Sequence, residues 1–195
     1  MASDDTRERI LEHGVRLIRK DGVAGVRIAD VAAGAGVSRQ AVYLHFTNRA
    51  GLLIEIARYL DLTIPQAQAI RASLRVDPPE AALAAFVRAV FNYMPIAMPL
   101  IAALDAAALT DEAARIAWTS RKQTVHDMFG VIVRRLHDAG RLKPSWSVAR
   151  ATDWGFVLLQ PKSWAELVLE RGWSSRTYAE HVLAQLETSL CQPTR

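Results

Sequence analysis

Residues 27–46 read RIADVAAGAGVSRQAVYLHF, and this stretch decides the fold predicted for the chain. Apolar residues recur at helical spacing on both sides of Gly36, which predicts two short helices joined by a sharp turn. The second helix divides into two faces. Its inward face holds Val37, Ala41, Val42 and Phe46, and its outward face holds Arg39, Gln40, Tyr43 and His45. This division is typical of a helix-turn-helix, whose second helix enters the major groove of DNA.

The charge of the chain supports this interpretation locally rather than globally. With 24 Lys and Arg against 20 Asp and Glu, the net charge is +4, a surplus too small to identify a polyanionic partner. Between Val31 and Ile54, however, no acidic residue occurs, while Arg39 and Arg49 do. Because phosphates repel carboxylates, a segment that approaches the DNA backbone is expected to lack them.

The remainder of the 195 residues also predicts helices. Ala, Leu, Arg and Glu dominate, and β-branched clusters of alternating polarity are scarce. Thr6 is a candidate N-cap for the first helix, and Thr47 or Asn48 for the helix that follows the helix-turn-helix. The later segments are longer and more apolar, and the first of them is expected to end in the region of Pro95 and Pro99. The fold class predicted is all-α.

Several classes of function find no support in the sequence. The single cysteine, Cys191, cannot form an internal disulfide, and the polar N-terminal segment lacks the apolar run of a signal peptide, so we expect a cytoplasmic protein. The longest apolar stretch, residues 94–104, is shorter than the ~20 residues that cross a bilayer, so no membrane partner is expected. The histidines are scattered and no catalytic motif is present, so we expect neither an enzyme nor a bound metal or cofactor.

Residues 6–60 resemble the tetracycline-repressor (TetR) family of bacterial transcription regulators. The resemblance lies in VRIADVAAGAGVSRQAVYLHFTNRAGLL, with its AGVS turn, its aromatic YxxF pair and a basic residue before a Leu-Leu helix. It implies an N-terminal three-helix DNA-binding domain over residues 4–64, with the helix-turn-helix at 27–46. It also implies a larger C-terminal helical domain, residues 65–195, that binds a ligand and forms a dimer.

The resemblance assigns DNA-binding roles to individual residues of this segment. Ser38 is expected to cap the second helix of the motif, and Arg39 and Gln40 to contact guanine and adenine edges respectively. The remaining expected contacts are to the phosphodiester backbone, from Tyr43, His45, Arg49 and Arg27. Arg49 stands where the family usually has lysine, and Arg27 where it commonly has a capping threonine. The alternatives are a packing role for Tyr43, stacking of His45 on Phe46, and solvated surface positions for the others.

Two C-terminal helices are the predicted dimer interface, because similar proteins pair them with their symmetry mates in a four-helix bundle. The first helix offers an apolar series and the second a near-heptad stripe. The predicted interface residues are Trp154, Val157, Leu158, Pro161, Tyr178, Val182 and Leu186. Packing within one chain is the alternative for each of them.

A ligand pocket is expected among the middle helices, where aromatic and methionine side chains gather around the two internal prolines. The predicted lining residues are Phe91, Met94, Met98, Asp105, Trp118, His126 and Phe129. Ordinary core packing is the alternative for each, and Asp105 is the candidate polar anchor.

Together these features predict a transcriptional regulator, most simply a repressor, that binds a palindromic DNA operator as a homodimer. A small, largely apolar effector would release it by favouring a dimer whose recognition helices no longer fit the operator. The alternative is a helical small-molecule-binding or carrier protein whose helix-turn-helix is vestigial.

Overall fold

A computed structural model describes residues 2–193, and within that range the chain is helical and contains no strand. The predicted all-α class is therefore confirmed. Contacts divide the chain into two compact units. The N-terminal unit comprises Met1–Thr63 and Ile96–Ser120, and the C-terminal unit comprises Ile64–Pro95 and Arg121–Arg195. The predicted domains differ from these units in residues 96–120, which the prediction assigned to the C-terminal domain.

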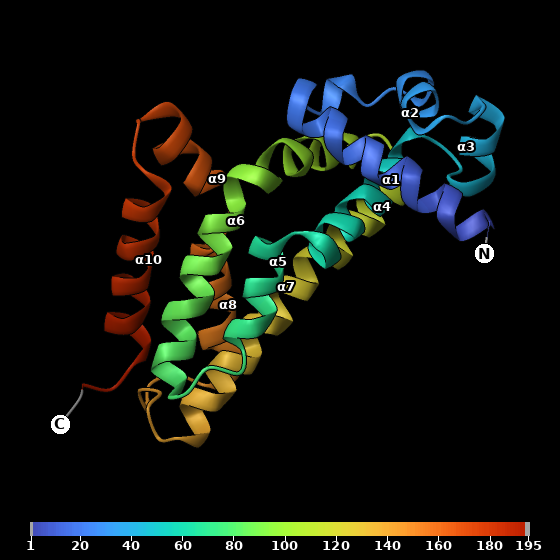
Figure 1. The fold of residues 1–195 in the computed structure, drawn as a ribbon. Helices are drawn as coiled ribbons and strands as arrows, with labels where there is room; N and C mark the ends of the chain where they lie inside the picture. The colour runs from blue at the N-terminus through green and yellow to red at the C-terminus, as the bar shows by residue number, and fades with distance from the viewer. Residues whose placement is uncertain (1, 194–195) are drawn as a thin grey trace. The chain divides into compact units, whose positions relative to one another are not determined.

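Four helices and one short 3-10 turn open the N-terminal unit (Figure 1). They are α1 (Ala2–Asp21), η1 (Val23–Gly25), α2 (Ile28–Ala35), α3 (Arg39–His45) and α4 (Arg49–Thr63). Helix α1 packs against α2 and α4, and α2 packs against α3. Because α1 already begins at Ala2, Thr6 lies inside it and is not its N-cap. The three-helix arrangement leaves α3 on the outside of α2, as a helix-turn-helix requires.

The turn between α2 and α3 depends on Gly36 and Ser38. Gly36 has the left-handed φ of 68° that favours glycine, and its N–H donates to the carbonyl of Ala33 at the end of α2. Two residues later, Ser38 Oγ accepts the N–H of Ala41 at 3.1 Å. The predicted cap of α3 is thus confirmed, and α3 begins at a defined residue.

The C-terminal unit contains α5 (Pro65–Ser73), α8 (Val148–Leu158), α9 (Pro161–Trp164), a π-helical turn η2 (Ala165–Glu170) and α10 (Ser175–Leu190). It also contains the first part of α6 (Pro79–Ala107) and most of α7 (Glu112–Asp138). Helix α10 lies alongside this part of α6, where Arg88 Nε donates to Glu180 at 2.8 Å (Figure 1). The buried core of this unit includes Phe86, Phe91, Phe129, Trp164 and Leu186.

Helix α6 does not end at its internal prolines, as the sequence predicted, but continues to Ala107. Proline lacks an N–H, so Pro95 leaves the carbonyl of Phe91 without its usual helical donor. Ser175 Oγ donates to that carbonyl at 2.6 Å and itself accepts the indole N–H of Trp164 at 3.0 Å. The beginning of α10 therefore supplies the hydrogen bond that the proline removes.

The uninterrupted α6 is long and apolar enough to cross a membrane by length and composition. Half of its most apolar window is buried inside the protein's own fold, and core helices also pass this test. The helix reaches this length because the prolines do not break it, so it extends well beyond the apolar stretch of residues 94–104. One such helix is weak evidence for a membrane protein.

The loop between α7 and α8 closes the C-terminal end of α10. The last carbonyls of a helix have no partner within the helix. In α10, the carbonyl of Leu190 accepts the Lys143 N–H at 2.7 Å, and the carbonyl of Ser189 accepts the indole N–H of Trp146 at 2.8 Å. The Trp146 ring in turn stacks on Trp154 of α8, with centroids 6.4 Å apart. This loop therefore connects the end of α10 to one side of α8.

Candidate nucleic-acid interface

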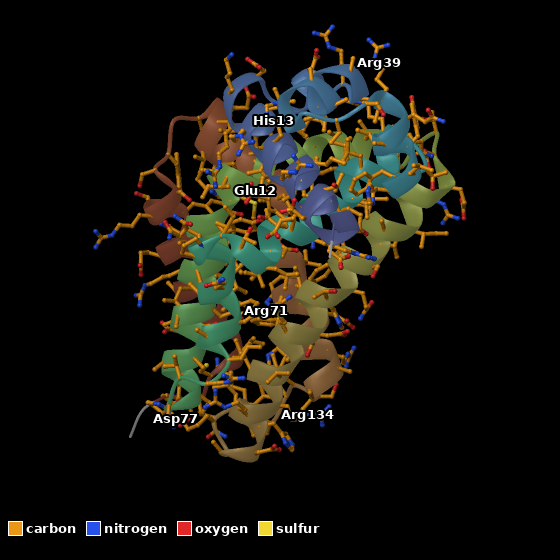
Figure 2. The ribbon with its side chains drawn as sticks, turned by 45° about the vertical axis from the view of Figure 1, so that its right-hand side comes forward. Glu12, His13, Arg39, Arg71, Asp77 and Arg134 are labelled. Carbon is orange, nitrogen blue, oxygen red and sulfur yellow. The ribbon has the colours of Figure 1, made fainter. Side chains whose placement is uncertain are left out.

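Helix α3 presents the outward face that the sequence predicts. Arg39 and Gln40 are exposed and Tyr43 is 54% exposed, whereas Val42 and Phe46 are buried against the rest of the unit. In Figure 2, the Arg39 side chain points away from the helices into solvent. These polar side chains are held on a short, capped helix and are free to approach a ligand.

Leu44 also belongs to this exposed face, although the sequence analysis assigned it no role. Its side chain is 82% exposed, which is unusual for a leucine inside a helix of a packed three-helix unit. The signal was present in the sequence, because Leu44 follows Gln40 by four residues and the two therefore share a helix face. The outward face thus combines hydrogen-bonding groups with one apolar group.

His45, at the edge of this face, contacts the buried ring of Phe46. Their ring centroids lie 6.1 Å apart with the planes tilted by 47°, so the stacking alternative for His45 has a geometric basis. On Phe46, the Arg7 guanidinium of α1 also lies 5.7 Å from the ring centroid. The end of α3 is therefore anchored on α1 through an aromatic ring.

Arg49, predicted as a phosphate contact, makes a structural contact that the sequence did not predict. From the first residue of α4, its Nε donates to the carbonyl of Val26 at 2.7 Å, and its Nη2 donates to the carbonyl of Val23 at 2.6 Å. These carbonyls belong to the η1 turn and the residue after it. Arg49 therefore joins α4 to the connection between α1 and α2. Asn48, one of the two predicted caps of α4, accepts the Gly51 N–H at 2.8 Å.

Arg27 is exposed, and its charge already has a partner. Its Nε lies 2.7 Å from the carboxylate of Asp30, one turn later on α2. The related family commonly has a capping threonine at this position, and the Arg27 side chain makes no capping hydrogen bond to α2. A phosphate at this position would therefore compete with a carboxylate for the guanidinium.

The predicted dimer residues fall into two groups. On α8, Trp154 is 38% exposed, Val157 is 56% exposed and Leu158 is half-buried, and Pro161 at the start of α9 is half-buried too. On α10, three of the predicted residues are buried within the chain itself, as the alternative of packing within one chain has it: Tyr178, Val182 and Leu186. The Tyr178 ring packs edge-on against Phe91 of α6, with centroids 4.8 Å apart. An apolar stripe at helical spacing predicts which face of a helix is buried. It does not predict whether that face is covered by the same chain or by a partner.

The predicted pocket residues are divided between the two units. Met98, Asp105 and Trp118 belong to the N-terminal unit, where the Trp118 indole N–H donates to Asp105 at 2.8 Å. The C-terminal unit contains Phe91, Met94, His126 and Phe129. Asp105, the expected polar anchor for a ligand, therefore already accepts a hydrogen bond from a side chain of the protein.

The two phenylalanines among the predicted pocket residues of the C-terminal unit are packed in its core. Phe91 and Phe129 are fully buried, and the Phe129 ring lies 5.9 Å from that of Phe86. A Cβ atom at Gly155 of α8 would lie 2.0 Å from Phe129, so only glycine permits this close approach of α7 and α8. These two phenylalanines occupy the interior rather than the wall of an open space.

His126 links α7 to α8 at the surface of the C-terminal unit. Its Nε2 lies 2.9 Å from Asp153 Oδ1, and its ring meets Phe156 edge-on at 5.4 Å. The hydrogen bond to Asp153 raises the pKa of the His126 imidazole above its ordinary value, against a smaller opposing effect of burial. The protonated form of His126 therefore strengthens the contact between α7 and α8.

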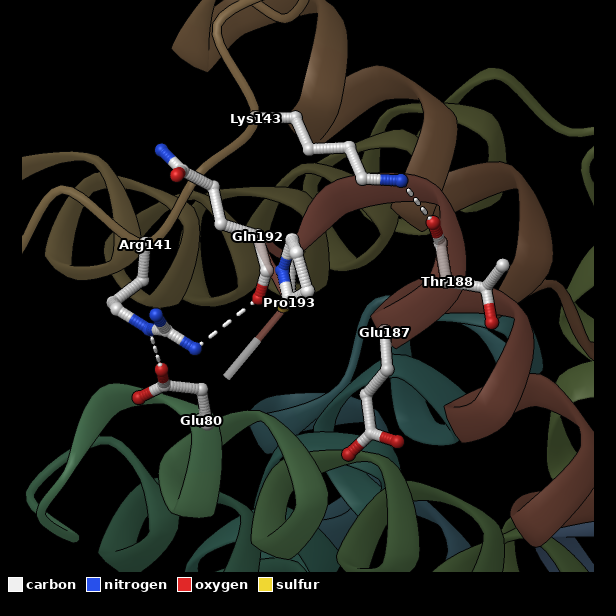
Figure 3. A pocket seen from close by; sticks show the side chains of 8 residues that line it. Glu80, Arg141, Lys143, Glu187, Thr188, Gln192 and Pro193 are labelled. Carbon is white, nitrogen blue, oxygen red and sulfur yellow. Dashed lines mark hydrogen bonds and ion pairs between the residues drawn. The ribbon is translucent and has the colours of Figure 1, made fainter. Parts of the chain in front are cut away.

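A pocket of about 560 Å³ lies at the end of α10, where the chain returns to the loop after α7 (Figure 3). It is lined by Glu80, Arg141, Lys143, Glu187, Thr188, Cys191, Gln192 and Pro193. None of the residues predicted to bind an apolar ligand is among them. Arg141 pairs with Glu80, and burial together with nearby carboxylates raises the pKa of the Cys191 thiol to about 11. This cysteine is therefore protonated and unreactive at neutral pH.

Comparison with known sequences identifies the N-terminal helices. Residues 10–56 match the model of the bacterial regulatory proteins of the tetR family. Over 77 residues, 39% of this chain and 37% of the relative, the sequence is 39% identical to the HTH-type transcriptional regulator TtgR of Pseudomonas putida. The matching segments span between 24% and 42% of the lengths of the curated relatives. These relatives are named as transcriptional regulators and not as enzymes.

Solved structures share the fold over nearly the whole chain. The transcriptional regulator FadR from Bacillus subtilis, in complex with stearoyl-CoA, has a TM-score of 0.73 and 15% identity, covering 93% of this chain and 98% of that one. NalD, the secondary repressor of the MexAB-OprM multidrug efflux pump in Pseudomonas aeruginosa, has a TM-score of 0.66 and 24% identity, covering 99% of both chains. Residues 10–56 therefore match the tetR family of bacterial regulatory proteins, and the chain as a whole shares the fold of solved transcriptional regulators.

Proposed function

We propose that this protein is a DNA-binding transcriptional repressor that binds a palindromic operator as a homodimer. The observation that carries the proposal is the exposed face of α3, which holds Arg39, Gln40 and Tyr43 on a capped helix in a segment without acidic residues. A helix of this kind fits the major groove, which is about 12 Å wide. The DNA-binding domain of the proposal is residues 4–64, and its intracellular location would be the cytoplasm.

Individual residues have distinct roles in this proposal. Arg39 contacts guanine O6 and N7 through two guanidinium nitrogens, and Gln40 contacts adenine N6 and N7. Tyr43 and His45 contact phosphates, with His45 braced by its neighbouring aromatic ring. Two nitrogens of Arg49, Nε and Nη2, donate to backbone carbonyls. Its third guanidinium nitrogen, Nη1, donates to a phosphate in this proposal.

The direct experiment selects bound fragments from random DNA with the full chain and then measures affinity for the enriched sequence by gel shift. Arg39→Ala should weaken binding by about 1–3 kcal/mol per half-site and relax the preference at one base pair. Arg134→Ala is the matched control, because Arg134 is an exposed arginine of α7 in the other unit. Equal affinity of the two variants and wild type would contradict the assignment of α3. Tight binding of small molecules with no enriched DNA would favour a carrier protein instead.

Residues 65–195 are proposed to form the dimer and bind the effector. The exposed apolar side chains of Trp154 and Val157 on α8 support a dimer interface at this helix. The apolar residues of α10 give no such support, because they are buried within the chain. Val157→Glu should convert a dimer at micromolar concentration into a monomer in analytical ultracentrifugation. Leu109→Glu, which changes an even more exposed apolar residue in the N-terminal unit, should leave the dimer intact. Monomeric wild-type protein would refute the dimer proposal.

A small, largely apolar effector completes the proposed mechanism. It draws support from the similarity of the fold to FadR, whose structure holds stearoyl-CoA. An effector must prefer one state of the dimer, and ~1–3 kcal/mol of coupling would change operator affinity by about 5–150-fold. Screening compounds for release of the selected DNA tests this step, and compounds that bind without changing DNA affinity would count against it.

A further inference from the structure

We propose that Leu44 contacts a thymine methyl group in the major groove, within about two base pairs of the base contacted by Gln40. This inference rests on the proposed function, since it needs α3 to lie in the groove. Its starting observation is the 82% exposure of Leu44 on the helix that carries the polar DNA-contact candidates. Neither the family motif nor the charge of the segment accounts for an exposed leucine there.

The geometry of α3 puts Leu44 at the centre of the outward face. Successive residues of an α-helix are rotated by about 100°, so Gln40 and Leu44 are separated by about 40° around the axis. Each of them is about 160° from Val42, the fully buried residue that defines the inward direction. By the same measure, Arg39 is only about 60° from Val42 and reaches the groove from the edge of the face. Gln40 and Leu44 therefore point most directly away from the core.

The chemistry of leucine then limits what this position can recognise. The major-groove edges of the four bases present hydrogen-bond donors and acceptors, and one apolar group, the C5-methyl of thymine. A leucine cannot satisfy the donors or acceptors, and covering them would remove their water without replacement. Only thymine offers a surface against which the Leu44 side chain gains from burial.

The spacing along the helix also predicts where the thymine lies. Gln40 and Leu44 are four residues apart, which corresponds to about 6 Å along the axis. One base step measures about 3.4 Å, so the thymine should lie within about two base pairs of the adenine that Gln40 contacts. An operator half-site should therefore contain a thymine and an adenine close together at the centre of the contacted segment.

Replacing thymine by deoxyuridine tests the proposal, because this exchange removes the C5-methyl group and leaves every hydrogen-bonding atom in place. In the operator selected with the wild-type chain, each thymine is replaced in turn and affinity is measured at fixed salt. At one position the exchange should weaken wild-type binding about fourfold per half-site, which corresponds to the ~0.8 kcal/mol of one buried methyl group. Leu44→Ala should weaken binding to the thymine operator at least as much and should be insensitive to the exchange at that same position.

Control variants separate this inference from the proposed function and from misfolding. Leu44→Met, which keeps an apolar side chain of similar reach, should retain the sensitivity to deoxyuridine, and Leu109→Ala should behave as wild type. Wild-type binding that is indifferent to every thymine-to-deoxyuridine exchange, or unchanged affinity of Leu44→Ala, would overturn the role of Leu44 while leaving the proposed function intact. Failure of the wild-type chain to enrich any DNA would overturn both.

Discussion

Replacing Arg49 by lysine separates the two roles of this residue, because lysine keeps the positive charge but loses the planar fork of donors. In the structure, that fork bridges the carbonyls of Val26 and Val23 at 2.7 and 2.6 Å. A hydrogen bond from a charged group contributes about 1.5–3 kcal/mol, and partial exposure of Arg49 to solvent favours the lower end. Lysine has one nitrogen where arginine uses two, so the loss of one hydrogen bond in Arg49→Lys should lower the free energy of unfolding by about 1.5 kcal/mol, and the loss of both in Arg49→Ala by about 3 kcal/mol.

Urea unfolding followed by circular dichroism measures this loss, with Arg39→Lys as the control. Arg39 is exposed and lies on the outward face of α3, so its replacement should change stability by less than about 0.5 kcal/mol. In gel shifts of folded protein, Arg49→Lys should keep the wild-type salt dependence, whereas Arg49→Ala should flatten it. An unfolding midpoint of Arg49→Lys equal to that of wild type would refute the structural role. The residue would then act only as the phosphate contact predicted from the sequence.

Three further predictions concern the C-terminal unit. Gly155→Ala should lower stability by about 1–3 kcal/mol in thermal melts, because its Cβ would meet the buried ring of Phe129; an unchanged melting temperature would contradict the close packing. Ser175→Ala should cost about 2–4 kcal/mol, since it leaves one buried donor and one buried acceptor without partners; a urea midpoint equal to wild type would argue against that relay. Because the pKa of His126 is raised, its bond to Asp153 stabilises the folded state fully below pH 6.5, and this stabilisation is lost as the pH rises through the folded-state pKa. Stability of wild type relative to His126→Gln should therefore fall over that range, and a constant difference would exclude the linkage.

Local features of the sequence predicted the helix-turn-helix well. The helix-turn-helix follows from helical periodicity, from Gly36 in a left-handed turn and from the Ser38 cap, all of which act within a few residues. The faces of α3 were also predictable, because burial of Val42 and exposure of Gln40 on the opposite side of the helix follow from the helical repeat. Leu44 received no role from the sequence, although its helical position four residues after Gln40 places it on the outward face.

Distant contacts account for the predictions that failed. Pro95 predicted the end of a helix, but Ser175, 80 residues later, satisfies the carbonyl that it leaves free. The stripe of α10 predicted a dimer interface, but α6 of the same chain covers it, through contacts such as that between Phe91 and Tyr178. Periodicity shows that a face is apolar, and it contains no information about which surface buries it.

The sequence by itself therefore determined the helical class, the helix-turn-helix and the outward residues of its second helix. These depend on hydrogen bonds and side-chain directions within one or two turns of helix, which neighbouring residues specify. The tertiary structure alone decided that Arg49 bonds to Val23 and Val26, and that the α10 stripe is core. Those outcomes depend on which segments meet after folding, and the partners lie between 23 and 92 residues apart along the chain.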